Sequence, residues 1–281
     1  MKDSLLLLFT SLVPLQAGSS GSKAVEAIPD KSAFSLFNPT PDSLMREFSS
    51  DRPDKTNSPQ TLNAGHFQFE TDLVSYTRNH DAGIRSEDWL VGNANLRIGL
   101  TNWADLQLLI PFYEISHESG SSRKEGLGDL TIGLKSNFWG NDDGPTSGGI
   151  SLFLKTPTAS HDLGNGKVEG AALINLGASL PADFDVGINS GVGITADDGG
   201  GYGAEFINSV SFSRSLFGPV SAYLEFYSDV PTKYSRDWVG TVDVGITVMV
   251  GKNFQLDTGV NFGVTGAADD AQTFLGLAVR F

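Results

Sequence analysis

An alternation of apolar and polar residues recurs along most of this chain and runs to its last residue. In the final stretch, residues 272–281, every second residue is apolar, and the set is Leu275, Leu277, Val279 and Phe281, preceded by Thr273. A period of two places successive side chains on opposite faces of a strand. A terminal strand that stays apolar up to Phe281 needs apolar surroundings at that end of the chain, and the edge of a bilayer supplies them.

The same pattern fills the chain from residue 63 onward in about twelve segments of roughly ten residues, which is the length a tilted strand needs to cross a bilayer. A soluble sandwich also alternates, but its strands are typically about five or six residues long. The opposing residues here are mostly small and hydrophilic, as in the segment 241–250, where Thr241, Asp243, Gly245 and Thr247 face four valines and one isoleucine. This composition suits a narrow interior that contains water.

The connectors alternate in length, which also favours a barrel over a sandwich. Short ones lie at 101–105, 181–183, 217–219 and 251–253, and longer polar ones at 78–88, 117–126, 157–168, 196–203 and 231–237. Outer-membrane barrels have this asymmetry. The connector 139–148 is the exception, because it is long on the short side. The sequence thus predicts an all-β fold: a closed, antiparallel, up-and-down transmembrane β-barrel of about 12 strands over residues 63–281, with short periplasmic turns and long extracellular loops.

The residues before the barrel divide into two parts. Residues 1–22 contain a short apolar run, Leu5 to Leu15, followed by small residues, which indicates a secretory signal peptide and a Gram-negative outer-membrane destination. Residues 23–62 are rich in proline and polar residues, so we expect a periplasmic leader or a plug in the barrel mouth, with one short helix at 41–48 that has Thr40 as N-cap. The plug interpretation rests on Leu44, Met45, Phe48, Arg52 and Asp54; a leader without a function is the alternative.

Composition narrows the possible partners. The formal net charge is -14, which argues against nucleic acid, because phosphate binding needs clustered Lys and Arg. Cysteine is absent, so a lipid anchor on cysteine is excluded. Beyond the N-terminus, no apolar run approaches the roughly 20 residues of a membrane-spanning helix.

The inward set of the predicted strands contains more acids than bases. We expect a lumen lined by Glu70, Asp72, Asn95, Arg97, Asp129, Lys135, Asp185, Glu205, Tyr223, Glu225, Asp243, Asp257 and Arg280. A water-filled lumen of this kind would favour cations or neutral polar solutes. The same charges could instead form an ion-pair and hydrogen-bond network that fills the interior. The sequence leaves these two alternatives open.

Few residues suggest other chemistry. His80, His117 and His161 each precede an acid in a predicted loop, but no loop has ligand-type spacing, so we expect no metal site and no cofactor, with these histidines as the weak candidates. Ser160, His161 and Asp162 adjoin in sequence and raise the possibility of a hydrolase embedded in the barrel. A nucleophile elbow is lacking and adjacent residues rarely form a relay, so we expect no enzyme.

Three stretches carry a resemblance to a known family. The run Arg52 to Pro59, the opening of the first strand at Gly65 to Glu70, and Gly126 to Leu130 resemble outer-membrane proteins assigned to transport in the meta-pathway of phenol degradation. The resemblance covers roughly residues 46–281 and implies a porin-like barrel that passes small organic solutes, aromatic ones among them; it carries over no catalytic residue.

The leading functional hypothesis is therefore an outer-membrane channel or transporter for the passive uptake of small organic solutes. The alternatives are a non-conducting structural or surface-binding barrel and, less favoured, the membrane-embedded hydrolase. The expected partners are outer-membrane lipid, a small organic solute, and the barrel-assembly machinery, which would read the C-terminal strand ending in Phe281.

Overall fold

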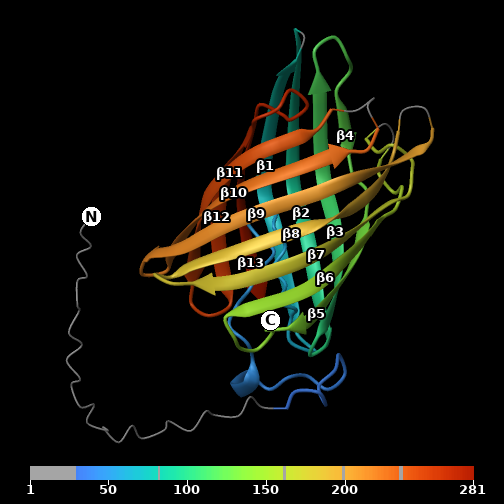
Figure 1. Cartoon of the computed structure of the whole chain (residues 1–281). Coiled ribbons are helices and arrows are strands. Elements are labelled where there is room, and N and C mark those ends of the chain that lie inside the picture. The colour runs from blue at the N-terminus through green and yellow to red at the C-terminus, as the bar shows by residue number, and fades with distance from the viewer. Residues whose placement is uncertain (1–29, 82, 161–162, 198–199, 234–236) are drawn as a thin grey trace, which may run out of the picture.

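The computed structural model describes residues 30–81, 83–160, 163–197, 200–233 and 237–281. The predicted signal peptide at 1–22 lies outside these residues, as do the first residues of the leader. Twelve strands form a closed antiparallel barrel, and one short extra strand extends its wall (Figure 1). The strands are β1 (Phe67–Asp81), β2 (Ile84–Thr101), β3 (Ala104–Glu118), β4 (Lys124–Gly126), β5 (Thr131–Trp139), β6 (Thr146–Lys155), β7 (Glu169–Leu180), β8 (Phe184–Ala196), β9 (Tyr202–Phe217), β10 (Val220–Pro231), β11 (Val239–Val250), β12 (Phe254–Gly263) and β13 (Ala271–Arg280).

Apart from the short strand β4, which pairs with β3 alone, each strand pairs with the barrel strands before and after it, and the last pairs with the first. Strand β13 meets β1 from Gln68 opposite Arg280 to Arg78 opposite Ala271. Strand β3 pairs with β5 near the short turns, and with β4 over Glu114–Ser116 toward the long loops. Closure leaves no free sheet edge, which a barrel in hydrocarbon requires. The predicted fold class is confirmed.

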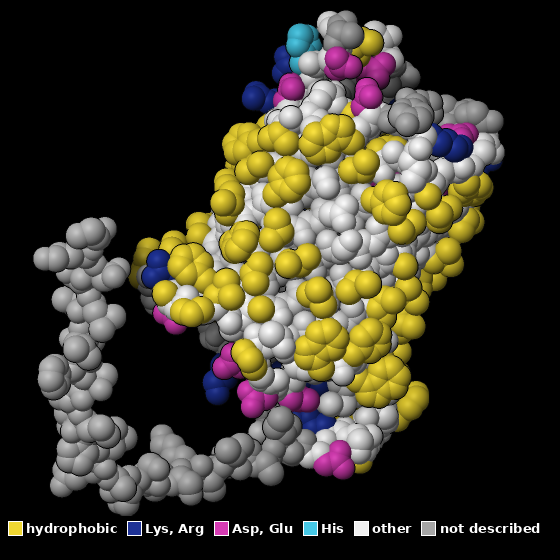
Figure 2. Space-filling view, viewed as in Figure 1, with side chains coloured by type: hydrophobic (Ala, Val, Ile, Leu, Met, Phe, Trp, Pro, Cys, Tyr) yellow, Lys and Arg dark blue, Asp and Glu magenta, His cyan; other side chains and the backbone are white. Residues whose placement is uncertain are grey.

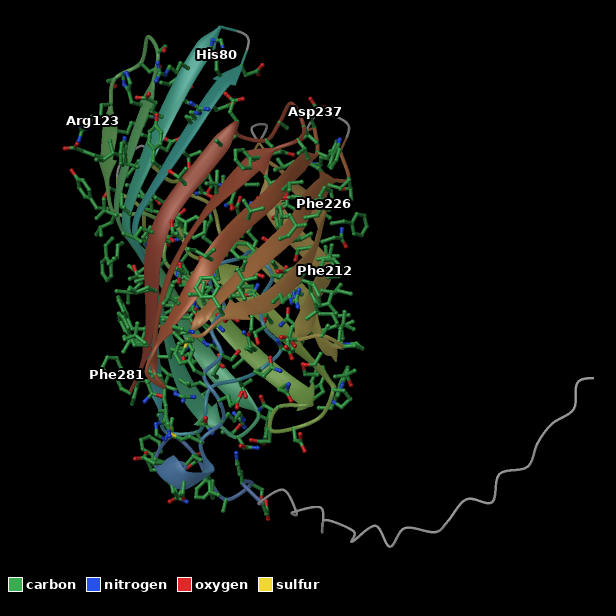
Figure 3. The ribbon with its side chains drawn as sticks, turned by 90° about the vertical axis from the view of Figure 1, so that its left-hand side faces the viewer. His80, Arg123, Phe212, Phe226, Asp237 and Phe281 are labelled. Atoms are coloured by element: carbon green, nitrogen blue, oxygen red, sulfur yellow. The ribbon has the colours of Figure 1, made fainter. Side chains whose placement is uncertain are left out.

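The alternation in sequence becomes an outside and an inside in the barrel. Outward side chains such as Ile188, Phe212 and Phe226 are each more than a third exposed, whereas their inward neighbours Asn189, Ser211 and Glu225 are buried. Hydrophobic side chains cover the outer wall between two charged ends (Figure 2), and Phe212 and Phe226 lie on its outer side (Figure 3). An apolar band of this kind faces lipid in outer-membrane barrels. Within the described residues, no helix is long and apolar enough to cross a membrane.

Two predicted segments differ from the structure. The predicted loop 78–88 is almost entirely strand, because β1 and β2 continue as a hairpin to the pair Asp81 and Ile84. Pairing between strands holds this hairpin together beyond the apolar band, where the sequence pattern no longer shows it. The predicted helix 41–48 is reduced to a single 3-10 turn, η1 (Asp42–Leu44), and Pro41 rather than Thr40 occupies its N-cap position. No side chain caps this turn, and no residue in it is buried.

The segment before β1 enters the barrel. From η1, below the short-turn end of the barrel, the chain rises into the lumen and returns to the start of β1 (Figures 1 and 3). Residues 46–63, called the plug segment from here on, contact inward residues on most of the strands. The interior is therefore largely polar: its most buried large side chains are Arg97, Lys135, Gln68, Gln107, Glu70 and Glu225.

Candidate functional site: a polar plug segment in the barrel lumen

The deepest contacts of the plug segment surround Asp51. Its carboxylate accepts hydrogen bonds from Lys135 and from Gln107 Nε2 at 3.1 Å, and lies 3.4 Å from Arg97 Nη1. Arg97 also forms ion pairs with Glu70 at 3.2 Å and Asp105 at 2.9 Å. The side chains of Arg97, Glu70, Asp105 and Lys135 are each at most 1% exposed. Buried charges persist only when they are paired, so this cluster fixes one side of the plug segment to β1, β2, β3 and β5.

Arg52 joins the plug segment to both sides of the seam where β1 pairs with β13. Its guanidinium pairs with Asp72 on β1 at 2.8 Å and with Asp257 on β12 at 2.7 Å. It also lies 5.7 Å from the centroid of the Phe274 ring on β13. Gly276 permits this approach, because a Cβ there would lie 1.9 Å from Arg52 Nη2.

The next residues, 54–57, reach the wall formed by β8 to β11. Asp54 lies near Ser211 of β9. Lys55 Nζ donates to Thr241 Oγ1 at 2.8 Å and Asp243 Oδ2 at 2.9 Å, and its backbone N–H donates to Glu225 at 2.9 Å. Thr56 Oγ1 lies 2.7 Å from Ser209 Oγ and donates to Glu225 at 2.5 Å, while the backbone of Asn57 exchanges two hydrogen bonds with the side chain of Asn189.

The returning part of the plug segment is held near the short turns. Asn137 Nδ2 donates to Pro59 O at 2.9 Å, and the backbone N–H of Leu62 donates to Asp105 at 2.8 Å. At the entrance, Arg46 Nε pairs with Asp142 at 2.9 Å, and Lys31 contacts the same carboxylate at 2.5 Å. Burial opposes ionisation of Asp142, but Lys31 and Arg46 outweigh it and hold the pKa of this carboxyl below its usual range.

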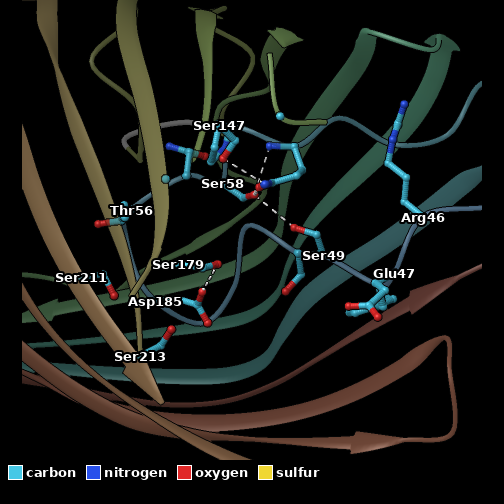
Figure 4. Close-up of a pocket in the computed structure, with 18 of the residues that line it drawn as sticks. Arg46, Glu47, Ser49, Thr56, Ser58, Ser147, Ser179, Asp185, Ser211 and Ser213 are labelled. Carbon is cyan, nitrogen blue, oxygen red and sulfur yellow. Dashed lines mark hydrogen bonds between the residues drawn. The ribbon is translucent and has the colours of Figure 1, made fainter. Parts of the chain in front are cut away.

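A cavity of about 840 Å³ remains between the plug segment and the lower wall (Figure 4). Hydroxyl groups provide much of its lining, among them Thr56 and Ser58 of the plug segment and Ser211 and Ser213 of β9. Asp185 also lines it and accepts a hydrogen bond from Ser179 Oγ at 2.7 Å. The space is thus suited to polar, hydrogen-bonding molecules.

Most predicted lumen residues meet the plug segment. Asp72, Arg97, Lys135, Glu225, Asp243 and Asp257 contact it as described. Glu70 accepts a hydrogen bond from the backbone N–H of Asp51 at 3.2 Å, and Arg280 Nη1 donates to Arg46 O at 3.0 Å. Of the predicted plug residues, Arg52 and Asp54 lie inside the lumen. Leu44, Met45 and Phe48 are half-buried below it, with the Phe48 ring centroid 5.7 Å from the Arg280 guanidinium.

The other predicted residues make different contacts. Asn95 donates to Gln107 at 3.5 Å, and Glu205 accepts from Thr195 at 3.1 Å. Tyr223 is buried and lines the cavity. Asp129 belongs to the connection between β4 and β5, where its carboxylate accepts hydrogen bonds from the backbone of residues 158 and 159. Whether any of these residues lines a conducting path stays a prediction.

Several important residues were not singled out from the sequence. Asp51 belongs to the mixed-charge run around Arg52, which was the available signal. Gln107 and Asn137 follow the strand alternation, whereas Asp105 falls in a predicted turn. No sequence pattern marked His66. Its Nδ1 lies 3.0 Å from Phe281 O and its Nε2 lies 2.8 Å from Thr40 O, so it joins the start of the barrel to the C-terminal residue and to the leader.

The weak metal candidates are not assembled into a site. His80 pairs opposite Arg85 in the β1–β2 hairpin, His117 pairs opposite Glu87, and His161 lies outside the described residues. Among the described residues, no group of three or more His, Cys, Asp or Glu side chains could hold a metal ion.

A comparison with protein-family models shows to which family the chain belongs. The family model described as "Putative MetA-pathway of phenol degradation" matches residues 50–281. The chain belongs to this family. The match begins in the plug segment and includes every barrel strand, so the family resemblance seen in the sequence is confirmed. No curated protein sequence matches the chain.

Similar solved structures are outer-membrane barrels. The NanC porin aligns with a TM-score of 0.50 at 7% sequence identity, over 75% of this chain and 98% of that chain. The translocator domain of the autotransporter NalP from Neisseria meningitidis has a TM-score of 0.48 at 11% identity, over 77% and 88%. An anion-selective porin from Comamonas acidovorans has a TM-score of 0.39 at 10% identity, over 77% and 98%. The NanC likeness concerns the fold alone. With its lipid-facing band and its family, the closed barrel is an outer-membrane protein.

Proposed function

We propose that this member of the phenol-degradation family is a channel for passive uptake of small organic solutes, including aromatic ones, and that the plug segment limits its opening. The observation that carries the proposal is the cavity of about 840 Å³, which lies inside a polar-walled barrel and is bounded by the plug segment. A barrel that served only as a scaffold would have no need of a hydroxyl-lined space of this size.

Charge supports a preference among solutes. Around the plug segment, the carboxylates of Asp54, Glu70, Asp72, Glu225 and Asp243 and their neighbours outnumber the cations Arg52, Lys55, Arg97 and Lys135. A lumen with excess negative charge repels anions and admits cations or neutral molecules. Phenols, which are mostly uncharged near neutral pH, meet this condition.

Conductance tests the proposal. The mature chain, refolded and inserted into planar bilayers, should give discrete current steps, and the reversal potential in a KCl gradient should show a preference for cations. Liposome swelling should then show entry of neutral phenol ahead of an aromatic carboxylate of similar size. Absence of current steps together with absence of swelling would favour the non-conducting barrel and refute the channel.

The hydrolase alternative gains no support from Ser160. Its hydroxyl accepts a hydrogen bond from Leu127 N at 2.8 Å, and its sequence neighbours 161 and 162 lie outside the described residues.

The export and assembly hypotheses belong to the same proposal. Residues 1–22 would be removed on export, and the barrel-assembly machinery would read β13 and the exposed ring of Phe281, which is 70% exposed. Phe281→Ala should lower the amount of protein inserted in the outer membrane while leaving refolding in detergent unchanged. Equal insertion of both proteins would remove this part of the proposal.

A further inference from the structure

The two sides of the plug segment are held by different kinds of contact. Toward β1, β2, β3 and β5, Asp51 belongs to the buried ion cluster, and residues 59–63 are tied to Asn137, Asn141 and Asp105. Charges desolvated to this degree are costly to separate from their partners. We call residues 46–51 and 59–63 the anchored part of the plug segment.

Residues 54–57, called the tip, are held by hydrogen bonds to neutral side chains and to one wall carboxylate, that of Glu225. Thr56 meets Ser209 and Asn57 meets Asn189, while the backbone N–H of Lys55 and the hydroxyl of Thr56 donate to Glu225. The tip's one ion pair joins Lys55 to Asp243, and Lys55 is the most exposed cation among the ion pairs of the plug segment, with 31% of its side chain exposed. Water therefore already reaches the ammonium group of Lys55, whereas its partner Asp243 is buried.

The tip borders the cavity. Asp54, Thr56 and Asn57 line the cavity on the periplasmic side, together with Ser211 and Ser213. Lys55 does not line that cavity, and its ammonium group lies 5.0 Å from the centroid of the Tyr227 ring. Tyr227 is six residues nearer the long loops on β10 than Ser221, which lines the cavity. Neighbouring residues of the tip thus face different parts of the lumen, and the tip forms one boundary of the cavity.

The wall opposite the tip carries small side chains. Strand β9 presents Ser209, Ser211 and Ser213, and its neighbour β8 presents Gly187, whose added Cβ would lie 3.0 Å from Thr56 Cγ2. On the neighbouring strands, Tyr223 of β10 covers Gly245 and Gly259, because a Cβ at these positions would lie 2.5 Å from Tyr223 Cε1 and 2.7 Å from Tyr223 Oη. The small side chains of this wall therefore lie on β8 and β9, and displacement of the tip would open space beside these two strands.

We propose that solutes pass between the plug segment and the wall formed by β8 to β11, and that the tip, residues 54–57, is the gate. The anchored part stays in place when the gate opens. This inference rests on the proposed channel function and adds the location of the path and its moving part. The solute meets Lys55 first from outside and the hydroxyls of Ser211 and Ser213 after the gate.

Paired cysteines test the location of the gate, because the chain has no cysteine of its own. Thr56→Cys with Ser209→Cys replaces two hydroxyls 2.7 Å apart and, when oxidised, ties the tip to β9. Thr61→Cys with Asn141→Cys replaces side chains joined at 2.8 Å and ties the anchored part to the β5–β6 turn. In both pairs the side chains are in contact; a disulfide also requires Cβ atoms about 3.5–4.5 Å apart. Mass spectrometry should confirm each bond before conductance is measured.

Oxidation of the first pair should abolish most of the conductance, and a reductant should restore it. Oxidation of the second pair should leave the conductance of its reduced form unchanged. Block by both pairs would mean that the plug segment leaves as one body, and block by neither, or by the second alone, would place the path elsewhere; each of these results overturns the inference. If the cysteine-free protein and both reduced variants fail to conduct, the proposed channel function fails, and the gate fails with it.

Discussion

Replacement of Arg97 measures how much the buried ion cluster contributes to the stability of the filled barrel. Arg97→Met keeps most of the aliphatic stem and removes the charge that joins Glu70, Asp105 and Asp51, at 3.2, 2.9 and 3.4 Å. Three carboxylates would then share one buried cation, Lys135. Removing one partner of a buried ion pair costs about 3–5 kcal/mol, because the remaining charge is left without compensation. That is a large part of the roughly 5–15 kcal/mol that separates most folded domains from their unfolded state.

Urea titration of the refolded protein in lipid vesicles, followed by tryptophan fluorescence, gives the free energy of unfolding. Arg85→Met is the matched control, since Arg85 lies on the same strand and pairs with Glu87 at 2.5 Å, but its side chain is 64% exposed. The control should unfold at the same urea concentration as the parent. A loss below about 1 kcal/mol for Arg97→Met would equal that of a solvated surface pair and refute the argument that these charges are desolvated.

Three further predictions follow from single positions. Ile188→Arg on the lipid-facing wall should cost about 2–4 kcal/mol in vesicle unfolding if it lies near the bilayer midplane, whereas Ser221→Arg in the cavity lining should cost much less; equal losses would contradict the assignment of the two faces. Gly99→Ala should displace the anchored part, because the new Cβ would lie 1.9 Å from Asn63 O, and trypsin should then cut after Lys55. Gly266→Ala is the control, because no atom lies within 4 Å of its added Cβ. Protection from trypsin in both variants would count against this packing. Acidification should release residues 31–46, because the pKa of Asp142 is held below its usual value of 3.8. The stabilisation that ionised Asp142 provides is complete above that pH and disappears as the pH falls through the lower folded value. Hydrogen exchange in residues 31–46 should then become faster in the parent, with no further change in Asp142→Asn.

The barrel could be predicted from the sequence because its two faces meet different solvents. The alternation in segments such as 184–194 and 241–250 needs only one rule, lipid outside and water inside, and the structure follows it strand by strand. The ends of the strands were harder to predict. The hairpin of β1 and β2 extends beyond the apolar band, where pairing continues between polar residues such as Thr77 and Asp88, and no solvent boundary marks its residues.

The contacts of the plug segment could not be predicted in the same way. The charges of the run Asp51 to Lys55 were visible, but their partners are more than 18 residues away in most cases and come from strands on every side of the barrel. Asp51 meets Lys135, whereas Lys55 meets Asp243, and nothing in either local sequence distinguishes one pairing from the other. The short helix failed for a related reason: contacts with the barrel fix residues 46–48, so only Asp42–Leu44 form a turn.

The position of His66 connects the closure of the barrel with the placement of the leader. One imidazole nitrogen faces the last residue of the chain and the other faces Thr40, next to the seam where β1 pairs with β13. The leader enters the lumen through the short-turn end, so the imidazole lies at the rim where the chain goes in and where the wall closes. One side chain thus couples the closed state of the cylinder to the placement of the segment that fills it.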